Sequence, residues 1–307
     1  MRVFVTGASG FIGAHVMEKL ISMKHQVAVL VTPYNPMTRL KPLQNKFEII
    51  TATLEDTTLL DKSIKAFRPE ACIHLAWYAE PEKYLNSEKN IQSLASSLSL
   101  FQTLIETGCK QIIAAGTCFE YDTNFGYLNE NTPARPESLY AAAKLSCYLS
   151  GSQLAAKANT LFSWGRIFYP YGPQEDPKRL VTATITTLEK GIPFPASAGE
   201  QIRDYIHVSD VATAFCTLME QKADGIFNIS TGSPVSVRHL LEIIEKLMDL
   251  KDLINIGSLP YRKWEPPFIC GNNARLRNLG WKPQYQLVNG LSQTINFITK
   301  NNTLMDY

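Results

Sequence analysis

The sequence has no apolar run that approaches the roughly 18 residues a membrane span needs. Its start, "MRVFVTG", lacks the basic and then apolar order of a secretory signal. No block of like charge reaches five residues and the net charge is only +2, which argues against a nucleic-acid or membrane surface. We therefore expect a cytoplasmic protein whose ligand is a small soluble molecule.

Paired cysteines are also missing. The six cysteines form no CxxC motif, and they stand at positions 72, 109, 118, 147, 216 and 270. Four of them lie within segments that we predict as strands or helices, as reduced buried thiols do. We expect neither a disulfide nor a metal site.

What is present is an alternation of short β-rich runs with helical ones. The predicted strands are 2–6, 27–31, 47–50, 72–76, 111–116 and 160–167, and the predicted helices are 11–23, 56–66, 88–107 and 138–156. Strands separated by helices at this rhythm form parallel βαβ units. Their continuous apolar runs indicate strands covered on both faces. The sequence thus predicts an α/β fold with a doubly wound parallel sheet.

The regular alternation of predicted strands and helices ends after residue 170. Proline and glycine cluster in "YPYGPQEDP", "GIPFPASAGE" and "LPYRKWEPP", and the elements between them no longer alternate. This pattern predicts a second, smaller lobe. One late segment, "GIFNIS" at 225–230, again reads as a buried strand, so we expect the chain to return to the sheet once.

A glycine-rich turn follows the first predicted strand. In "TGASGFIG", Gly7, Gly10 and Gly13 lead into the helix at 11–23. Glycines at these steps allow a tight turn and close approach of a pyrophosphate, and the helix N-terminus offers free N–H groups. The alternative is a glycine-rich turn without a ligand, and the strand-turn-helix context favours dinucleotide binding.

The GxxGxxG spacing resembles the extended branch of the short-chain dehydrogenase/reductase superfamily, the NAD-dependent epimerases and dehydratases that modify nucleotide sugars. The family's order of motifs continues through "CIHLAW", "AAGTCFEY", "YAAAK", "GRIFYPYGP", "RDYIHVSDVA", "FNISTG" and "LGWKP". The resemblance covers nearly the whole chain. It implies a Rossmann-like domain at 1–170, to which 205–230 returns, and a substrate-binding lobe at 171–204 and 231–307.

Tyr140 and Lys144 lie four residues apart and so share one face of the helix at 138–156. The structural alternative is a packed tyrosine beside a solvated lysine. The resemblance implies catalysis instead, with Thr117 as the third member. Tyr140 then exchanges a proton with the substrate, Thr117 donates a hydrogen bond to the same oxygen, and Lys144 favours the phenolate and holds the nicotinamide ribose.

The resemblance also implies the cofactor site. The residues that we assign to it, besides Tyr140 and Lys144, are Gly7, Ser9, Gly10, Phe11, Ile12, Gly13, Thr32, Arg39, Leu54, Leu75, Ala76 and Trp77. Members that prefer NAD carry an Asp at the end of the second strand, where this chain has Thr32. With no carboxylate to repel a 2′-phosphate and with Arg39 nearby, NADP is favoured over NAD, and both stay open.

For the substrate, the resemblance implies a nucleotide-diphosphate sugar. Arg203 is the expected diphosphate ligand because a guanidinium matches two phosphate oxygens, with Arg262 and Arg179 as further candidates. Tyr169 stands where many relatives have an Asn that faces the sugar. We expect Asp210 to be structural, as the cap of the helix that follows it.

The residues after Thr117 narrow the reaction. Dehydratases of the family continue with Asp and Glu, where this chain has Cys118 and Phe119, and neither side chain can move a proton as a carboxylate does. The same lack of Glu argues against a uronate decarboxylase. Cys118 also stands one residue too early for the catalytic cysteine of the epimerase-reductases that make GDP-fucose.

Four functions remain open. The first is a reductase of a 4-keto-6-deoxy nucleotide sugar, and the second is a nucleotide-sugar 4-epimerase on the same site. A non-catalytic dinucleotide-sensing regulator would be expected to lack one of Thr117, Tyr140 and Lys144. A reductase of aldehydes or steroid-like ketones would gain nothing from Arg203. The helices at 88–107 and 138–156 resemble those through which relatives pair, so we expect a homodimer.

Overall fold

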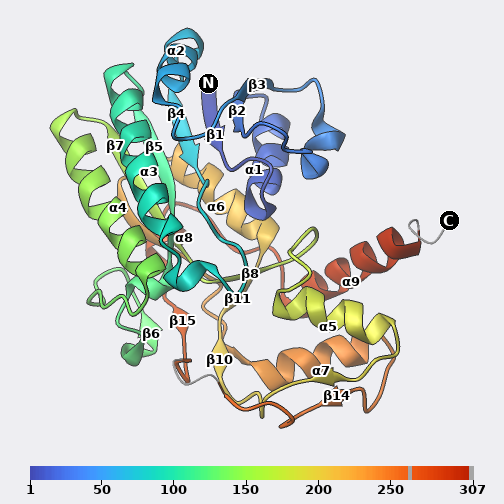
Figure 1. Ribbon diagram of the computed structural model, residues 1–307. Helices are drawn as coiled ribbons and strands as arrows, with labels where there is room; N and C mark the ends of the chain where they lie inside the picture. The colour runs from blue at the N-terminus through green and yellow to red at the C-terminus, as the bar shows by residue number, and fades with distance from the viewer. Residues whose placement is uncertain (262–264, 304–307) are drawn as a thin grey trace.

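Seven parallel strands form the central sheet of the computed structural model, which describes residues 1–261 and 265–303 (Figure 1). Their order across the sheet is β12-β7-β5-β4-β1-β2-β3. The bounds are β1 Arg2–Thr6, β2 Gln26–Val31, β3 Glu48–Thr51, β4 Ala71–His74, β5 Gln111–Thr117, β7 Leu161–Ile167 and β12 Gly225–Ile229. The ends of each predicted strand of the first half are therefore confirmed to within two residues. The apolar runs that predicted these strands are buried because helices cover both faces of the sheet.

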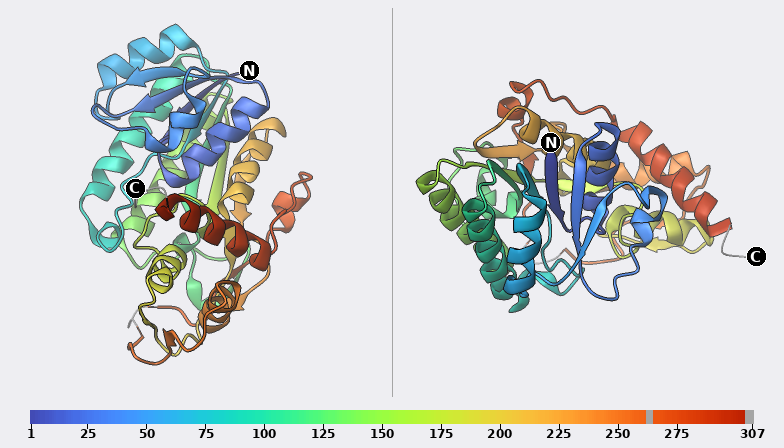
Figure 2. Two further views of the ribbon diagram at one scale, coloured as in Figure 1. Left: turned by 90° about the vertical axis from the view of Figure 1, so that its right-hand side faces the viewer. Right: turned by 90° about the horizontal axis from the view of Figure 1, so that it is seen from above.

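Helices cover both faces of the sheet, as Figure 2 shows. On one face lie α1 (Phe11–Ser22) and α6 (Val208–Glu220), and on the other lie α2 (Thr57–Phe67), α3 (Lys89–Glu106) and α4 (Leu139–Lys157). Each face has its own buried apolar cluster, one with Val16 and Phe215 and the other with Phe101 and Phe162. The doubly wound, Rossmann-like fold is thus confirmed.

The expected return of the chain to the sheet is confirmed by β12, which pairs in parallel with β7 at the sheet edge. The segment that leads there contains β11 (Tyr205–His207) and α6. β11 pairs with β8 (Tyr169–Tyr171) outside the main sheet. A second short pair, β6 (Tyr127–Leu128) with β15 (Cys270–Gly271), lies near the end of β5.

The remaining elements gather at the carboxyl end of the sheet strands (Figure 1). They include α5 (Leu180–Glu189), α7 (Val237–Leu247) and α9 (Leu287–Thr303), together with the short strands β9 (Phe194–Pro195), β10 (Ile202–Arg203), β13 (Val235–Ser236) and β14 (Ile254–Asn255). Ile185, Leu240 and Leu291 form a core between these helices. The short helix α8 (Ala274–Arg277) brings Leu276 into the α1 and α6 cluster, so this late segment also packs on the sheet side.

The prediction that Asp210 caps the helix after it is wrong. The helix α6 begins at Val208, and its N-cap is His207, whose Nδ1 accepts a hydrogen bond from the Ser209 N–H. Asp210 lies inside the first turn and accepts hydrogen bonds from the backbone N–H groups of Gln284 and Tyr285 at 2.8 and 3.0 Å. Its carboxylate therefore ties the C-terminal segment to α6.

All six cysteines are buried and their thiols are free. No helix in the part of the chain that the structure describes is long and apolar enough to cross a membrane.

Candidate active site

The turn between β1 and α1 has the shape that a pyrophosphate needs. Gly7 has a positive φ of 71°, and a Cβ there would lie 2.6 Å from the Ala76 nitrogen. A Cβ at Gly13 would lie 2.0 Å from the Gly7 carbonyl oxygen. Gly10 is the N-cap of α1 and brings no side chain to its free N–H groups. The backbone N–H groups and the dipole of α1 are thus open to an anion, so the turn fits a dinucleotide.

Two side chains from the segment after β2 reach this turn. Asn35 donates a hydrogen bond from Nδ2 to the Ser9 hydroxyl at 3.2 Å. Arg39, in the 3₁₀ segment η1 (Thr38–Leu43), donates to the carbonyl oxygens of Ser9 and Gln174 at 3.4 and 3.1 Å. Thr32 is exposed directly after β2. Asn35 and Arg39 therefore lie against the glycine turn at Ser9, and Thr32 lies three residues before Asn35 at the end of β2.

The ends of β1 and β4 form the floor of the cofactor site. The Ala76 N–H donates to the Thr6 hydroxyl at 3.3 Å, and the Leu75 N–H donates to the Thr6 carbonyl oxygen. His74 is buried beneath them and hydrogen-bonds the hydroxyls of Thr6 and Ser97 at 2.7 and 2.9 Å. Burial lowers the pKa of His74 to about 3, and the nearby Lys144 adds to this, so the imidazole stays neutral. The remaining residues predicted here, Phe11, Ile12 and Leu54, are half-buried.

Thr117, Tyr140 and Lys144 come together at the carboxyl end of β5. Thr117 is the last residue of β5, and its side chain forms a hydrogen bond with Tyr140. Tyr140 and Lys144 come from the first two turns of α4, which Ser138 caps by accepting the Ala141 N–H at 3.2 Å. The Lys144 ammonium donates to the Ala115 carbonyl oxygen at 2.8 Å. The spacing of four residues therefore places both side chains against the same strand.

Burial governs the ionisation of this group. It raises the pKa of the Tyr140 phenol above its ordinary value, with smaller contributions from Tyr84 and Glu120, and the hydrogen bond from Thr117 opposes the shift. Burial lowers the pKa of Lys144 to about 8. In the free protein at neutral pH the phenol is therefore protonated and the lysine is mostly charged.

Trp77 covers Lys144 from the other side. The Lys144 ammonium nitrogen lies 3.9 Å from the centre of the indole ring. The indole N–H donates to the Asn90 side-chain oxygen at 2.9 Å, which fixes the orientation of the ring. The half-buried Trp77 thus packs directly against the Lys144 ammonium.

The predicted substrate residues face the same end of the sheet. The guanidinium of Arg203 lies 5.4 Å from the centre of the Tyr169 ring and is almost fully buried. It donates to the Glu265 carboxylate at 3.0 Å. Arg179 is the N-cap of α5, and its guanidinium lies 5.3 Å from the centre of the Tyr84 ring. The predicted Arg262 lies outside the described residues.

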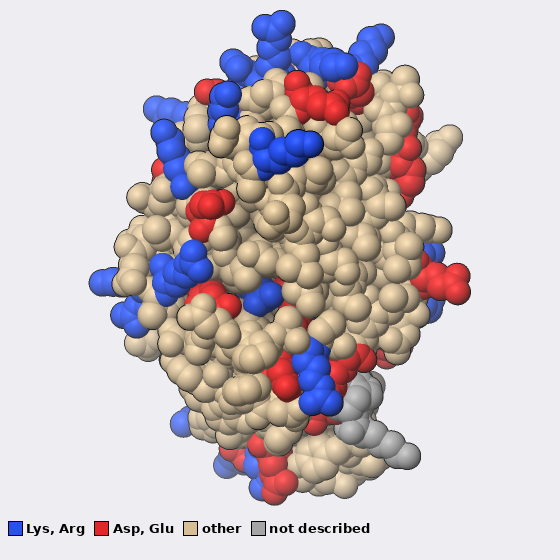
Figure 3. All heavy atoms as spheres, turned by 90° about the vertical axis from the view of Figure 1, so that its left-hand side faces the viewer, with Lys and Arg blue, Asp and Glu red and all other residues tan. Residues whose placement is uncertain are grey.

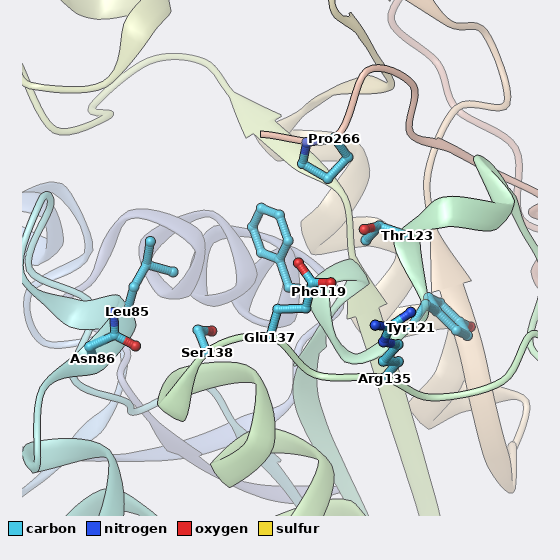
Figure 4. A pocket seen from close by; sticks show the side chains of 9 residues that line it. All are labelled: Leu85, Asn86, Phe119, Tyr121, Thr123, Arg135, Glu137, Ser138 and Pro266. Atoms are coloured by element: carbon cyan, nitrogen blue, oxygen red, sulfur yellow. The ribbon is translucent and has the colours of Figure 1, made fainter. Parts of the chain in front are cut away.

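A pocket is lined by residues within 85–138 of the first half of the chain and by Pro266 (Figure 4). Figure 4 shows Phe119 at its centre, with Leu85 to one side and Pro266 above. The complete lining is Leu85, Asn86, Phe119, Tyr121, Thr123, Arg135, Glu137, Ser138 and Pro266. The lining combines the apolar and aromatic side chains Leu85, Phe119, Tyr121 and Pro266 with the polar or charged side chains Asn86, Thr123, Arg135, Glu137 and Ser138.

Sequence reasoning missed two residues of this site. Tyr84 comes from the 3₁₀ segment η2 (Tyr84–Asn86), and its ring meets the Tyr140 ring edge-on, with the centres 4.8 Å apart. Glu120 comes from the turn η3 (Cys118–Glu120) and is completely buried behind Thr117. The available signal for Glu120 was a carboxylate at the end of the apolar run "IIAAGTCFEY".

Comparison with known proteins assigns the family. The model of the NAD-dependent epimerase/dehydratase family matches residues 3–230. The chain is 27% identical to a dTDP-6-deoxy-L-talose 4-dehydrogenase (NAD(+)) from Aggregatibacter actinomycetemcomitans, over 88% of this chain and 99% of the relative. It is 26% identical to a probable UDP-glucuronate 4-epimerase from Rhizobium meliloti, over 98% of both chains.

The fold comparison agrees. The crystal structure of UDP-glucose 4-epimerase from Thermotoga maritima with UDP-glucose has a TM-score of 0.89 and 25% identity, and the match covers 98% of this chain and 100% of that one. The resemblance inferred from the motifs is thereby confirmed. The chain is an enzyme and belongs to the NAD-dependent epimerase/dehydratase family.

Proposed function

We propose that this protein is an NAD(P)-dependent 4-ketoreductase of a nucleotide-diphosphate sugar, with a 4-keto-6-deoxy sugar as the substrate. The observation that carries the proposal is the convergence of the Thr117 hydroxyl, the Tyr140 phenol and the Lys144 ammonium at the carboxyl end of β5. The family and the similarity to a 4-dehydrogenase support chemistry at carbon 4.

In the proposed reaction, Tyr140 donates its phenolic proton to the 4-oxygen of the sugar. Thr117 donates a hydrogen bond to the same oxygen and stabilises the charge that develops there. A bound nicotinamide dinucleotide supplies the hydride. The Lys144 ammonium stabilises the phenolate that remains.

The protonated state of Tyr140 is compatible with the reductive direction. Because burial raises the pKa of the phenol, the free enzyme holds the proton that a ketone reduction consumes. An enzyme that begins by oxidising a sugar hydroxyl needs the same group as a base. If carbon 6 of the sugar lies against Phe119, Leu85 and Pro266 in the pocket, these apolar side chains suit a methyl group there better than a hydroxyl or a carboxylate.

Arg203 is the proposed ligand of the substrate diphosphate. Its guanidinium is held by Glu265, and a diphosphate would take the place of that carboxylate as an anionic partner. Tyr169 packs under the guanidinium. We keep Arg179 and Arg262 as further candidates, and the lobe at 171–204 and 231–307 as the part of the chain that binds the substrate.

Elimination of water is not part of the proposal. Cys118 is buried and burial raises the pKa of its thiol to about 12, so it does not ionise near neutral pH. Phe119 has no ionisable group that could transfer a proton. The carboxylate of Glu120 accepts hydrogen bonds from Thr117, Trp164 and Arg166 and is completely buried, whereas that of Glu137 belongs to the pocket lining.

The second candidate is a nucleotide-sugar 4-epimerase. The similarity to a probable UDP-glucuronate 4-epimerase and to the Thermotoga maritima epimerase favours it, because the same three groups serve both reactions. An epimerase retains and recycles its nicotinamide, which fits tight NAD binding, and the lack of a carboxylate at Thr32 weakens that fit. A non-catalytic dinucleotide-sensing regulator is disfavoured because Thr117, Tyr140 and Lys144 are all present.

The test is incubation of the purified enzyme with NADPH or NADH and a panel of nucleotide sugars, including 4-keto-6-deoxy sugars. Oxidation of one nicotinamide for each sugar reduced supports the reductase. Interconversion of hydroxyl epimers without net oxidation supports the epimerase instead. Reduction of simple aldehydes or ketones with no gain from a nucleotide diphosphate would contradict both. The Tyr140→Phe variant should lose turnover in either case.

For the cofactor we propose NADP(H) over NAD(H). Thr32 leaves room for a 2′-phosphate, and Arg39 lies at the glycine turn through its hydrogen bond to Ser9. The cytoplasm is the proposed location, on the strength of six reduced and buried thiols.

We also propose a homodimer that pairs through α3 and α4. These helices carry the exposed apolar side chains Ile91, Leu149 and Leu154. Figure 3, which views this side of the molecule, shows a wide central area without charged side chains. Apolar and uncharged surface of this kind is typical of an interface. A monomeric mass in sedimentation equilibrium would contradict the proposal.

A further inference from the structure

We propose that Glu120 is a positioning residue for the catalytic Thr117, and that its pairing with Arg166 sets the electrostatic environment of Tyr140. Only the turnover test of this inference rests on the proposed function. The contacts that support the inference are all between residues of this chain and involve no substrate.

The carboxylate of Glu120 is completely buried and fully engaged. Its Oε1 accepts the backbone N–H of Thr117 at 2.8 Å. Both oxygens lie 3.0 Å from the indole nitrogen of Trp164, and Oε2 accepts the Arg166 Nε–H at 2.7 Å. Trp164 and Arg166 both belong to β7, the strand beside β5. One side chain therefore ties the catalytic turn to the neighbouring strand.

The lack of a side chain at Gly116 leaves space for the Glu120 carboxylate. Gly116 stands directly before Thr117, and a Cβ there would lie 2.7 Å from Glu120 Oε1 and 2.1 Å from the Trp164 indole nitrogen. The Arg166 guanidinium also lies 4.1 Å from the centre of the Tyr121 ring. A buried ion pair is costly to place unless each partner is held by further hydrogen bonds. Here the additional partners are present on both sides.

The contact at Thr117 orients its hydroxyl. Glu120 fixes the backbone N–H of Thr117, and the Thr117 hydroxyl oxygen accepts the Phe119 N–H at 3.3 Å. The hydroxyl hydrogen is thereby left to donate on the other side, toward Tyr140 and the substrate oxygen. A displacement of about 1 Å at a catalytic group can cost on the order of 100-fold in rate.

Charge gives a second, separable effect. Burial is the largest cause of the raised pKa of Tyr140. Electrostatic interactions with Tyr84, Glu120 and Cys118 raise this pKa further, and the hydrogen bond from Thr117 lowers it. Glu120 also supports the charged form of Lys144. In the intact enzyme Arg166 pairs with Glu120, so removal of the carboxylate alone leaves the buried Arg166 guanidinium as an unpaired positive charge. That charge favours the phenolate and disfavours the ammonium, so both pKa values fall.

The experiment compares Glu120→Gln, Glu120→Asp and Glu120→Gln/Arg166→Gln with the parent enzyme, each loaded with its nicotinamide cofactor. For Glu120→Gln we expect turnover to fall about 10- to 100-fold, the cofactor Kd to stay within about twofold, and the midpoint of the pH profile to move to lower pH. Glu120→Asp should lose turnover and keep the midpoint, because it keeps the charge and withdraws the contact with Thr117. The double variant should restore the midpoint.

The control is Asp210→Asn, a second buried carboxylate that holds backbone N–H groups far along the chain. It should lower the melting temperature and leave the pH midpoint unchanged. Unchanged turnover and midpoint in folded Glu120→Gln, or a loss explained by cofactor binding alone, would overturn the proposal.

A second readout separates this inference from the proposed function. The ultraviolet absorbance of tyrosinate is titrated in the holoenzyme, and the Tyr140 contribution is the difference from Tyr140→Phe. The Tyr140 pKa should fall in Glu120→Gln whether or not any keto sugar is reduced. If no substrate in the panel reacts but this pKa falls, the proposed function fails and the electrostatic inference stands. If the pKa does not fall, the inference fails.

Discussion

The Lys144 ammonium nitrogen lies 3.9 Å from the centre of the Trp77 indole ring. The face of an indole ring attracts a cation by about 0.5–2 kcal/mol, and the larger value applies when both groups are desolvated. This attraction opposes the burial that lowers the pKa of Lys144 to about 8. Trp77 therefore helps to keep Lys144, the proposed catalytic lysine, charged at neutral pH.

Replacement of Trp77 by Ala should lower the pKa of Lys144 further. We expect the decline of activity at high pH to begin about 0.5–1 unit lower, since 1.36 kcal/mol corresponds to one unit. The measurement is turnover against pH at saturating cofactor. Trp77→Phe keeps a smaller ring and should shift the profile less. A shift toward higher pH would show that the indole does not stabilise the ammonium.

Lys144 itself should reduce the stability of the fold. Its folded pKa of about 8 lies below the ordinary value of 10.5, so the cost of burying its charge is complete below about pH 8 and disappears as the pH rises toward 10.5. Lys144→Met should therefore abolish turnover and raise the free energy of unfolding at pH 7 by roughly 1–3 kcal/mol. Urea unfolding of the cofactor-free protein at pH 7 and at pH 10 measures this difference. A gain that is no smaller at pH 10 than at pH 7 would contradict the explanation.

Much of this site was predictable from the sequence because its parts are local. The glycine turn and the pair formed by Tyr140 and Lys144 each lie within one short segment, where spacing alone determines which side chains share a face. The role of Glu120 was not predictable, since its partner Arg166 lies 46 residues away and meets it only after β5 and β7 pair. Asp210 was assigned to a cap for the same reason, because its true partners, Gln284 and Tyr285, come from a distant segment.

The contact of Arg203 with Glu265 shows a further limit of sequence patterns. The motif indicates an arginine for a diphosphate, but it does not reveal that the guanidinium is almost fully buried and already paired. Likewise, the Trp at position 77 stands out in "HLAW", and only the fold shows that its ring covers Lys144.

The glycine turn allows a graded test of cofactor binding. Gly13→Ala places a Cβ 2.0 Å from the Gly7 carbonyl oxygen, so the turn must move. Gly10→Ala places its Cβ 3.1 Å from the same oxygen and asks for a smaller adjustment. We expect the Kd of NADPH to rise by about 100-fold or more in Gly13→Ala and by less in Gly10→Ala, since displaced N–H groups no longer meet the pyrophosphate. Fluorescence titration with NADPH measures both, and equal affinities in both variants and the parent would refute the assignment of the turn.

The proposed preference for NADP over NAD rests on Thr32 and Arg39. Arg39→Ala removes the cation at the rim of the turn, and a lost charge-assisted hydrogen bond of about 1.5–3 kcal/mol corresponds to roughly a 10- to 100-fold weaker binding of NADPH with little change for NADH. Thr32→Asp adds a carboxylate that repels a 2′-phosphate and accepts the ribose hydroxyl, so it should favour NADH. The matched control is Lys41→Ala, which removes an exposed positive charge from the same 3₁₀ segment and should leave the ratio of the two Kd values unchanged. Equal effects of Arg39→Ala on NADPH and NADH would mean that Arg39 only supports the turn through Ser9 and Gln174, and the proposed preference for NADP would then be wrong.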